Sequence, residues 1–342
     1  MTKLDPLKTS SYDYELPKEL IATYPVTPAS DAKLLVYNRE TKTITHTTFN
    51  HLIQYIPKDS KIFLNDTKVI KARIFGKKDT GGKVELLFNK PHIDDTFMVY
   101  IRGRVHIGTK LYFEDDLVVE VVDMYEDGMR VVKFFKDDIQ LDFIQVVELL
   151  NKIGHIPLPH YLEREDEKSD DITYQTLFAS NYGAVAAPTA SLHFTPELLQ
   201  DIKDKFETNY LTLHVGAGTF KPVECDDILE HPMHSEYYNI PNKSKEILDS
   251  CDDILAVGTT VTRTIEYYND TKQQNGEANL FLNPLNKPKK VKYLLTNFHL
   301  PKSTLIMLVA SFIGLEETLR VYDEAIKNRY RFFSYGDGML IV

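Results

Sequence analysis

The pattern of apolar and polar positions changes twice along the chain. Near the N-terminus, the runs KLLVYNRE and TITHTTF flank a polar turn at residues 40–42, which predicts a β-hairpin. The next run, FNHLIQYI, has the spacing of a short helix. From residue 61 to about 146, short runs rich in Val, Ile, Phe and Tyr alternate with turn signals such as Gly81–Gly82. About six such strands predict a small antiparallel β-barrel.

After Gly154 the pattern becomes strand, loop and helix. The runs YLTLHVGAGTF, DDILAVGTTVTRTIEYY and KYLLTNFHLPKSTLIMLVASFIG each lead an apolar strand into a polar loop. RFFSYGDGMLIV is expected to close the chain as a strand pair. Strand-to-helix repeats favour parallel strands covered by helices, and their C-terminal loops meet at one edge of the sheet. We therefore predict an α/β domain of residues 1–60 and 151–342, interrupted by a β-barrel domain of residues 61–150, with one site at the three polar loops.

Composition narrows the class of protein. The 342 residues are 43% hydrophobic and carry a formal net charge of -10. That charge argues against a protein that coats nucleic acid, but it allows an RNA enzyme with a local basic face. The cysteines, Cys225 and Cys251, have no disulfide or metal spacing and favour a reducing cytoplasm. No apolar run is long enough to span a bilayer, so we expect no membrane association.

The stretch LLTNFHLPKST places Asn297, His299, Lys302, Ser303 and Thr304 within eight residues, before a strongly apolar run. Ser303 or Thr304 is expected to cap the helix that begins near Leu305. That structural task leaves Asn297, His299 and Lys302, which we assign to the site.

Other dense stretches permit both structural and chemical interpretations. In GAVAAPTASLHFTPELLQ, Thr195 and Pro196 begin a helix, but His193 and the small residues around Thr189 are unexplained. Small residues allow either the close approach of a ligand or tight internal packing. In HVGAGTFKPV, Gly216 and Gly218 close on Thr219 and can present backbone N–H groups to an anion.

Three further stretches offer titratable or hydroxyl groups. HPMHSE contains His234 and Glu236; Pro232 disfavours a helical zinc site, so an acid/base cluster and a structural cluster remain open. Thr259 and Thr260 can cap a helix or hold an anion, with Arg263 one turn further on. For Asn65–Asp66, and for Asp337 near the C-terminus, a turn is the alternative to a functional role.

Ten stretches occur in an order that resembles one family, the S-adenosylmethionine:tRNA ribosyltransferase-isomerases of queuosine biosynthesis. They span nearly the whole chain: LNDTKVIKARIFG, TGGKVELL, GHIPLP, YQTLFA, GAVAAPTASLHFT, TLHVGAGTFKPV, HPMHSE, VGTTVTR, LLTNFHLPKSTL and YRFFSYGDGML. The resemblance implies a barrel-like α/β domain with an inserted antiparallel β-barrel. It also implies that S-adenosylmethionine donates a ribosyl group to 7-aminomethyl-7-deazaguanine in tRNA. Epoxyqueuosine-tRNA, adenine and methionine are the implied products, and no metal or further cofactor is expected.

The implied reaction needs a base for the carbon beside the sulfonium, an acid for the departing adenine, and partners for the methionine carboxylate. We expect acid/base work from His193, His214, His234 and His299, oriented by Glu236 and Asp337. Thr259, Thr260 and Arg263 suit the carboxylate, and Asn65 and Asp66 suit ribose hydroxyls or a base edge. The remaining expected substrate-binding residues are Arg73, Thr189, Gly216, Gly218, Thr219, Asn297 and Lys302. We expect a monomer that acts on tRNA.

The sequence also departs from the family pattern. ASDAKLL lacks the usual arginines, NPLNKPKKVKY replaces a Pro-Gly loop, and Lys221 stands in place of an arginine. His160 and Gly338 are further replacements. These departures leave two alternatives: a diverged relative with a different acceptor, including a small molecule, or a protein that binds RNA or adenosylmethionine without catalysis.

Overall fold

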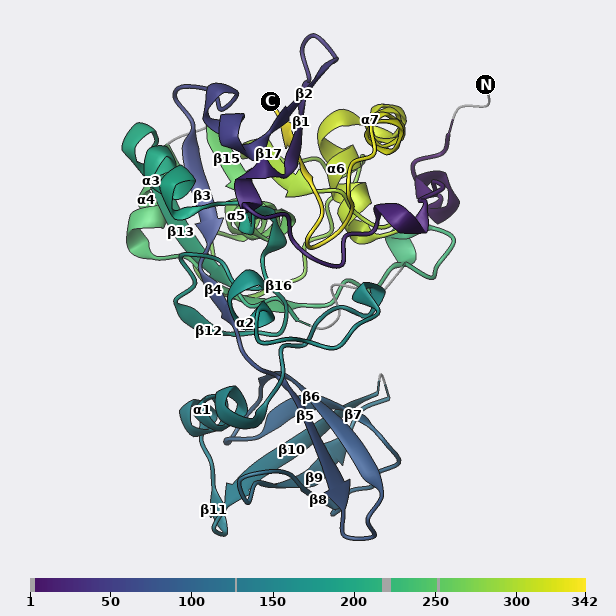
Figure 1. Cartoon of the computed structure of the whole chain (residues 1–342), viewed down its shortest axis with the longest axis vertical. Helices are drawn as coiled ribbons and strands as arrows, with labels where there is room; N and C mark the ends of the chain where they lie inside the picture. The colour runs from purple at the N-terminus through teal and green to yellow at the C-terminus, as the bar shows by residue number, and fades with distance from the viewer. Residues whose placement is uncertain (1–3, 127, 217–222, 251–252) are drawn as a thin grey trace.

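The computed structural model describes residues 4–126, 128–216, 223–250 and 253–342, which form two parts joined at a narrow waist (Figure 1). The larger part contains a nine-stranded mixed sheet in the order β16-β14-β13-β3-β15-β17-β18-β1-β2. Its strands are β1 (Lys33–Asn38), β2 (Thr43–Thr48), β3 (Lys61–Asn65), β13 (Thr208–Leu213), β14 (Glu236–Asn239), β15 (Ile254–Val257), β16 (Asn275–Ala278), β17 (Val291–Asn297) and β18 (Gly338–Ile341).

The centre of this sheet explains where a site can form. Strands β13, β3, β15 and β17 are mutually parallel, so their C-terminal ends meet at one edge. β18 runs antiparallel to β17, with Gly338 opposite Asn297, which brings the loop before β18 to the same edge. The predicted convergence of the C-terminal strand ends at one edge of the sheet is therefore confirmed.

Helices cover both faces of the sheet because its central strands are apolar on both sides; every residue of β15, for example, is buried. α6 and α7 share a core with Leu35 of β1, whereas α3 and η4 share a core with Leu34 on the opposite face. The elements around the sheet are η4 (Phe49–Gln54), α3 (Pro196–Lys205), α4 (Asn242–Ser250), α5 (Thr259–Thr271), α6 (Thr304–Ile313) and α7 (Leu315–Lys327).

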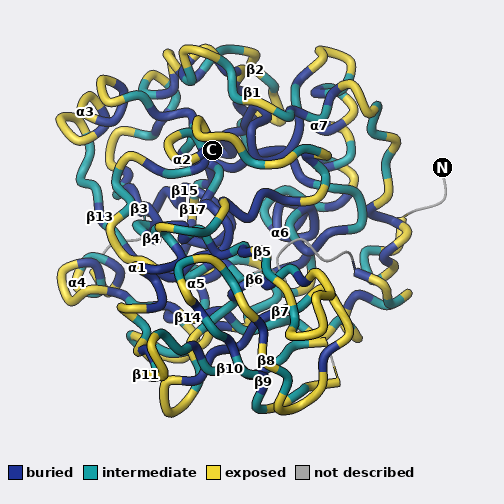
Figure 2. The backbone as a smooth tube through the Cα atoms, turned by 60° about the horizontal axis from the view of Figure 1, so that its bottom comes forward, coloured by how far each residue is buried: buried dark blue, intermediate teal, exposed yellow. Residues whose placement is uncertain are grey.

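The smaller part is a closed antiparallel barrel. β10, β7, β6, β5, β8 and β9 follow one another, and pairing of β10 with β9 closes the circle. Alternate residues of β6 point inward, among them Val84, Leu86 and Phe88. Figure 2 shows buried positions along the strands and exposed positions mainly in the connecting loops. The elements are β5 (Arg73–Lys78), β6 (Lys83–Pro91), β7 (Phe97–Arg102), β8 (Lys110–Tyr112), β9 (Val118–Met124), β10 (Met129–Lys136), β11 (Ile139–Gln140) and α1 (Phe143–Ile153).

The α/β class, the inserted barrel and the N-terminal hairpin β1–β2 are confirmed. Two details differ from the sequence predictions. β3 pairs with β13 and β15 rather than with the barrel, because a short run buried on both faces belongs in a parallel sheet. After β3, strand β4 (Thr67–Val69) pairs with β12 (Asn181–Ala184) in a two-stranded parallel sheet. We propose that the inserted domain begins after β4. The C-terminal run forms a single strand, β18, because residues 331–337 form a loop.

Candidate active site

A pocket of about 250 Å³ lies at the C-terminal ends of β15 and β17. Five of the expected site residues line it, and they come from three separate loops: Thr189, Thr259, Thr260, Asn297 and His299. Apolar side chains such as Val215, Phe298 and Leu300 make up much of the remaining wall. A few polar groups in a largely apolar pocket are typical of a small-molecule site.

Asn297, the last residue of β17, is held by three neighbours. Its Oδ1 accepts a hydrogen bond from Thr189 Oγ1 at 2.8 Å. Its Nδ2 lies 3.3 Å from Nε2 of His193 and 3.5 Å from the carbonyl oxygen of Asp337. His193 therefore lies behind Asn297, packed on the ring of Phe49, and does not line the pocket. Its role in this arrangement is to fix the amide.

His299 lies on the pocket wall. The ring Nε2 is 2.9 Å from Oγ1 of Thr296. The backbone N–H of His299 donates to the Tyr322 hydroxyl at 3.1 Å, and its backbone carbonyl accepts from the Tyr14 hydroxyl. Burial lowers the pKa of His299 to about 3. The imidazole is therefore neutral at pH 7 and can exchange hydrogen bonds with a bound molecule.

The N-terminus of α5 faces the same pocket through Thr259 and Thr260. Gly258 precedes the helix at φ 101°, a conformation that favours glycine. No side chain caps this end, so the N–H groups of the first turn and the positive end of the helix dipole remain available to an anion. Asn65 contacts Thr260, with its Nδ2 3.4 Å from the Thr260 hydroxyl oxygen.

Tyr161 and Ser334 also line the pocket, although neither is among the site residues expected from the sequence. The two hydroxyls lie 2.5 Å apart, and the Tyr161 ring packs against Phe333 with centroids 4.6 Å apart. Burial raises the pKa of Tyr161 to about 12, so its hydroxyl keeps its proton at neutral pH. Tyr161 closely follows the family-like stretch GHIPLP, and Ser334 lies within the stretch YRFFSYGDGML.

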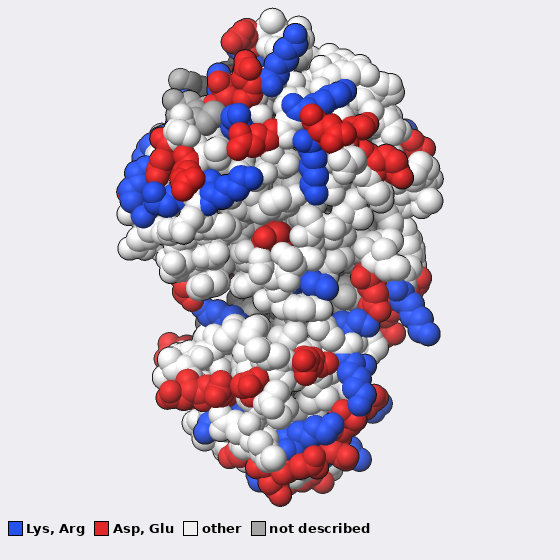
Figure 3. All heavy atoms as spheres, turned by 90° about the vertical axis from the view of Figure 1, so that its left-hand side faces the viewer, with Lys and Arg blue, Asp and Glu red and all other residues white. Residues whose placement is uncertain are grey.

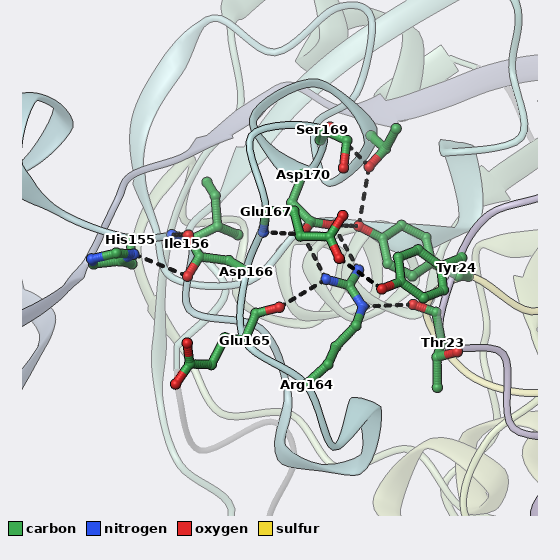
Figure 4. A network of polar contacts seen from close by, with 12 residues as sticks. Thr23, Tyr24, His155, Ile156, Arg164, Glu165, Asp166, Glu167, Ser169 and Asp170 are labelled. Carbon is green, nitrogen blue, oxygen red and sulfur yellow. Dashed lines mark hydrogen bonds and ion pairs between the residues drawn. The ribbon is translucent and has the colours of Figure 1, made fainter.

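The charged loop after Tyr161 is anchored by an ion pair (Figure 4). Arg164 Nη1 and Nη2 bind the two carboxylate oxygens of Asp170 at 2.7 and 2.8 Å, and Arg164 Nε donates to the carbonyl of Thr23. The Tyr335 hydroxyl donates to the same carboxylate at 2.7 Å. This network ties the loop that carries Tyr161 to the segment that carries Ser334.

Glu236 and Arg263, which were assigned to orientation and carboxylate binding, contact each other instead. Arg263 Nη1 lies 2.8 Å from Glu236 Oε2, and both side chains are buried. Glu236 also accepts the N–H of Gly216 at 3.0 Å. Each charged group is therefore the counter-ion of the other, and neither of them lines the pocket.

His214, Asp66 and Asn65 lie at the junction of β3, β4 and β13. His214 Nδ1 is 2.8 Å from Oγ1 of Thr67, and burial lowers the pKa of this histidine to about 4. Asp66 accepts the Thr212 hydroxyl at 2.6 Å, while Asn65 Oδ1 accepts the N–H of Leu213. These contacts support the strands around the site, and none of the three residues lines the pocket.

The remaining expected residues are dispersed. Asp337 accepts the N–H groups of Lys33 and Arg331, and burial raises its pKa. Lys302 turns outward to Asp13, with Nζ 2.6 Å from Oδ2. His234 is half-buried before β14, Arg73 begins the barrel, and Gly218 and Thr219 lie outside the described residues. Within the described ranges, no group of three or more His, Cys, Asp or Glu side chains is arranged to hold a metal.

Comparison with known proteins gives a consistent result. A family model described as "Queuosine biosynthesis protein" matches residues 9–341. A protein of Aliarcobacter butzleri named S-adenosylmethionine:tRNA ribosyltransferase-isomerase is 67% identical, covering 99% of this chain and 100% of that relative. A protein of the same name from Nitratiruptor sp. is 59% identical over 99% of this chain and 100% of its own length. The crystal structure of an S-adenosylmethionine tRNA ribosyltransferase from Thermotoga maritima has a TM-score of 0.54 and 33% identity, covering 97% of this chain and 100% of that one.

Proposed function

Because this chain belongs to the family of queuosine biosynthesis proteins, we propose that it transfers and isomerises the ribosyl group of S-adenosylmethionine onto 7-aminomethyl-7-deazaguanine in tRNA. Adenine and methionine are released, and epoxyqueuosine-tRNA is formed. The observation that carries the proposal within this fold is the pocket where an uncapped helix N-terminus, a fixed amide and a neutral imidazole converge.

The first turn of α5 would bind the carboxylate of the methionine moiety. Its N–H groups and the hydroxyls of Thr259 and Thr260 are suited to an anion, and the helix dipole adds to the attraction. Arg263 would act indirectly, because Glu236 already neutralises it. The carboxylate is thus held largely by uncharged donors.

His299 is the proposed base for the ribose carbon beside the sulfonium. A protonated imidazole would repel that cation, and burial keeps His299 neutral at pH 7. When His299 accepts the proton, a carbanion remains on the ribose carbon beside the ring. Its negative charge stabilises the imidazolium form of His299, which burial alone disfavours. Thr296 holds one ring nitrogen and so orients the ring.

Tyr161 would assist the departure of adenine. Its hydroxyl stays protonated at neutral pH and forms a hydrogen bond with Ser334 on the pocket wall. A phenol in that state can donate a hydrogen bond to a ring nitrogen of the leaving base. Asn297, fixed by Thr189 and His193, would bind the ribosyl hydroxyls or the adenine edge.

The tRNA would bind through local cations, because the formal net charge is -10. On the face drawn in Figure 3, Lys and Arg side chains are interspersed with Asp and Glu. Each phosphate contact releases about one condensed counterion, so the affinity should fall as salt rises, with a slope set by the number of contacts. We also propose that the protein acts as a cytoplasmic monomer. Within the described residues, no helix has the length and apolarity of a membrane span.

The departures from the family pattern that fall on described residues do not line the pocket; Lys221 lies outside the described residues. None of residues 283–292 lines it, and Glu266 anchors that segment by accepting the N–H groups of Lys289, Lys290 and Val291. A different acceptor, or binding without catalysis, is the alternative function.

A turnover assay tests the proposal. Purified protein is incubated with S-adenosylmethionine and tRNA that carries 7-aminomethyl-7-deazaguanine, and adenine release is followed by chromatography. We expect release that requires the modified tRNA, with unmodified tRNA as control. Binding of S-adenosylmethionine without release would exclude the proposed acceptor.

A further inference from the structure

A second cavity, of about 290 Å³, lies between the barrel and the larger part of the molecule. Arg73 and Leu87 contribute from the barrel, and Leu158, Pro159 and Val185 from the larger part. We infer that this cavity binds the 7-deazaguanine base of the acceptor tRNA during transfer. The inference rests on the proposed function and assigns the acceptor half of the site.

The first pocket, which we call the donor pocket, shares a wall with this second cavity. Tyr161 and Leu300 line both of them, so a base in the second cavity lies directly beside a donor in the first. Transfer between two bound substrates requires this proximity, because reacting atoms must approach within about 3–3.5 Å.

The lining suits a flat heteroaromatic ring with a polar edge. Leu87, Leu158 and Val185, together with Pro157 and Pro159, give the cavity an apolar lining on which the face of such a ring can pack. Extruded bases are bound in this way, by packing of their faces and hydrogen bonds to their edges.

Arg73 supplies the polar edge. Its side chain is only 17% exposed, with Nε 3.2 Å from Glu85 Oε1 and Nη2 3.4 Å from the carbonyl of Leu158. A guanidinium typically binds the O6 and N7 acceptors of guanine. The 7-deaza base keeps O6 and has carbon at position 7, so Arg73 would recognise the 6-oxo group. Its weak contact with Leu158 leaves a donor that a ligand can take.

The cavity also accounts for the insertion of the barrel. Arg73 begins β5 and Leu87 lies on β6, whereas the donor pocket contains no barrel residue. The barrel would therefore complete the acceptor site and leave the donor site unchanged. This separation predicts that changes at the barrel wall affect the RNA substrate alone.

The first test fills the cavity. In Leu87→Trp we expect the KM for an anticodon stem-loop carrying 7-aminomethyl-7-deazaguanine to rise at least tenfold, while the Kd for S-adenosylmethionine changes less than twofold. Ile139→Trp, an exposed barrel position on β11, is the matched control and should change neither. An unchanged KM in folded Leu87→Trp would overturn the inference.

The second test changes the polar edge and keeps its charge. Arg73→Lys should lower the preference for a 6-oxo over a 6-amino 7-deazapurine stem-loop about tenfold, whereas a purely structural role would reduce turnover of both alike. Binding of the free base, 7-aminomethyl-7-deazaguanine, is measured in parallel by calorimetry. If wild-type protein released no adenine, the proposed function would be refuted. In that case, loss of free-base binding in Leu87→Trp would still support the assignment of the cavity. Base binding that is indifferent to both substitutions would refute that assignment.

Discussion

At the scale of single residues, position rather than type separates the buried histidines. His193, His214 and His299 all have pKa values lowered by burial, to about 3, 4 and 3. Only His299 lines the donor pocket. His193 forms a hydrogen bond with Asn297, and His214 with Thr67. A lowered pKa therefore marks burial here, and contact with the pocket identifies the catalytic candidate.

His299→Ala should reduce the kcat of adenine release by about 10²- to 10⁴-fold, the usual effect of removing a general base. The Kd for S-adenosylmethionine should change little, because the anion-binding end of α5 is untouched. His51→Ala, at an exposed histidine, is the control. Single-turnover assays with modified tRNA provide the measurement, and intact turnover in His299→Ala would remove our catalytic assignment.

At the scale of elements, one buried ion pair fastens helix α5 to strand β14. Arg263 lies one turn into α5 and Glu236 begins β14, so their contact sets how the helix N-terminus meets the sheet edge. Removal of one partner leaves the other charge buried without its counter-ion. The pair thus acts on the donor pocket by positioning α5.

Arg263→Met should lower the free energy of unfolding by about 3–5 kcal/mol, because the buried Glu236 carboxylate loses its Arg263 counter-ion. Arg320→Met removes the exposed pair with Glu317 and should cost less than about 1 kcal/mol. Urea titrations of both variants give the comparison. Unchanged stability of Arg263→Met, together with weaker binding of S-adenosylmethionine, would instead favour direct contact between Arg263 and the substrate.

At the scale of the whole molecule, the buried neutral histidines couple stability to pH. Below the unfolded pKa of about 6.5, the unfolded chain binds protons that the native histidines do not accept. Stability therefore rises with pH in this range and falls as the pH drops from about 6.5 toward the native values near 3 and 4. We expect the protein to be acid-labile.

His214→Gln should reduce this acid sensitivity. Each such histidine contributes a slope of up to about 1.4 kcal/mol per pH unit between the unfolded and native pKa values. In the variant, the slope of unfolding free energy between pH 6 and 4.5 should fall by about that amount. Urea unfolding at several pH values measures it, with the exposed His51→Gln as control. Equal slopes in wild type and His214→Gln would show that His214 titrates normally.

The amino-acid sequence alone was sufficient to predict the local elements and the family. Periodicity indicated the barrel and the strand-to-helix units, and Ser303 does cap α6, with its Oγ 3.3 Å from the N–H of Ile306. These features depend on neighbouring residues, which a sequence displays directly. The ten ordered stretches identified the family, which the full-length matches confirm.

The sequence could not predict which polar groups share a pocket, and the three-dimensional fold was needed to show it. The fold paired Arg263 with Glu236, turned Lys302 toward Asp13, and added Tyr161 beside Ser334. β3 also lies in the large sheet, although its pattern of apolar residues resembles that of the barrel strands. The physical reason is that distances between residues far apart in the chain are set by strand order and by burial. Whether a charged side chain meets a ligand or a counter-ion depends on those distances.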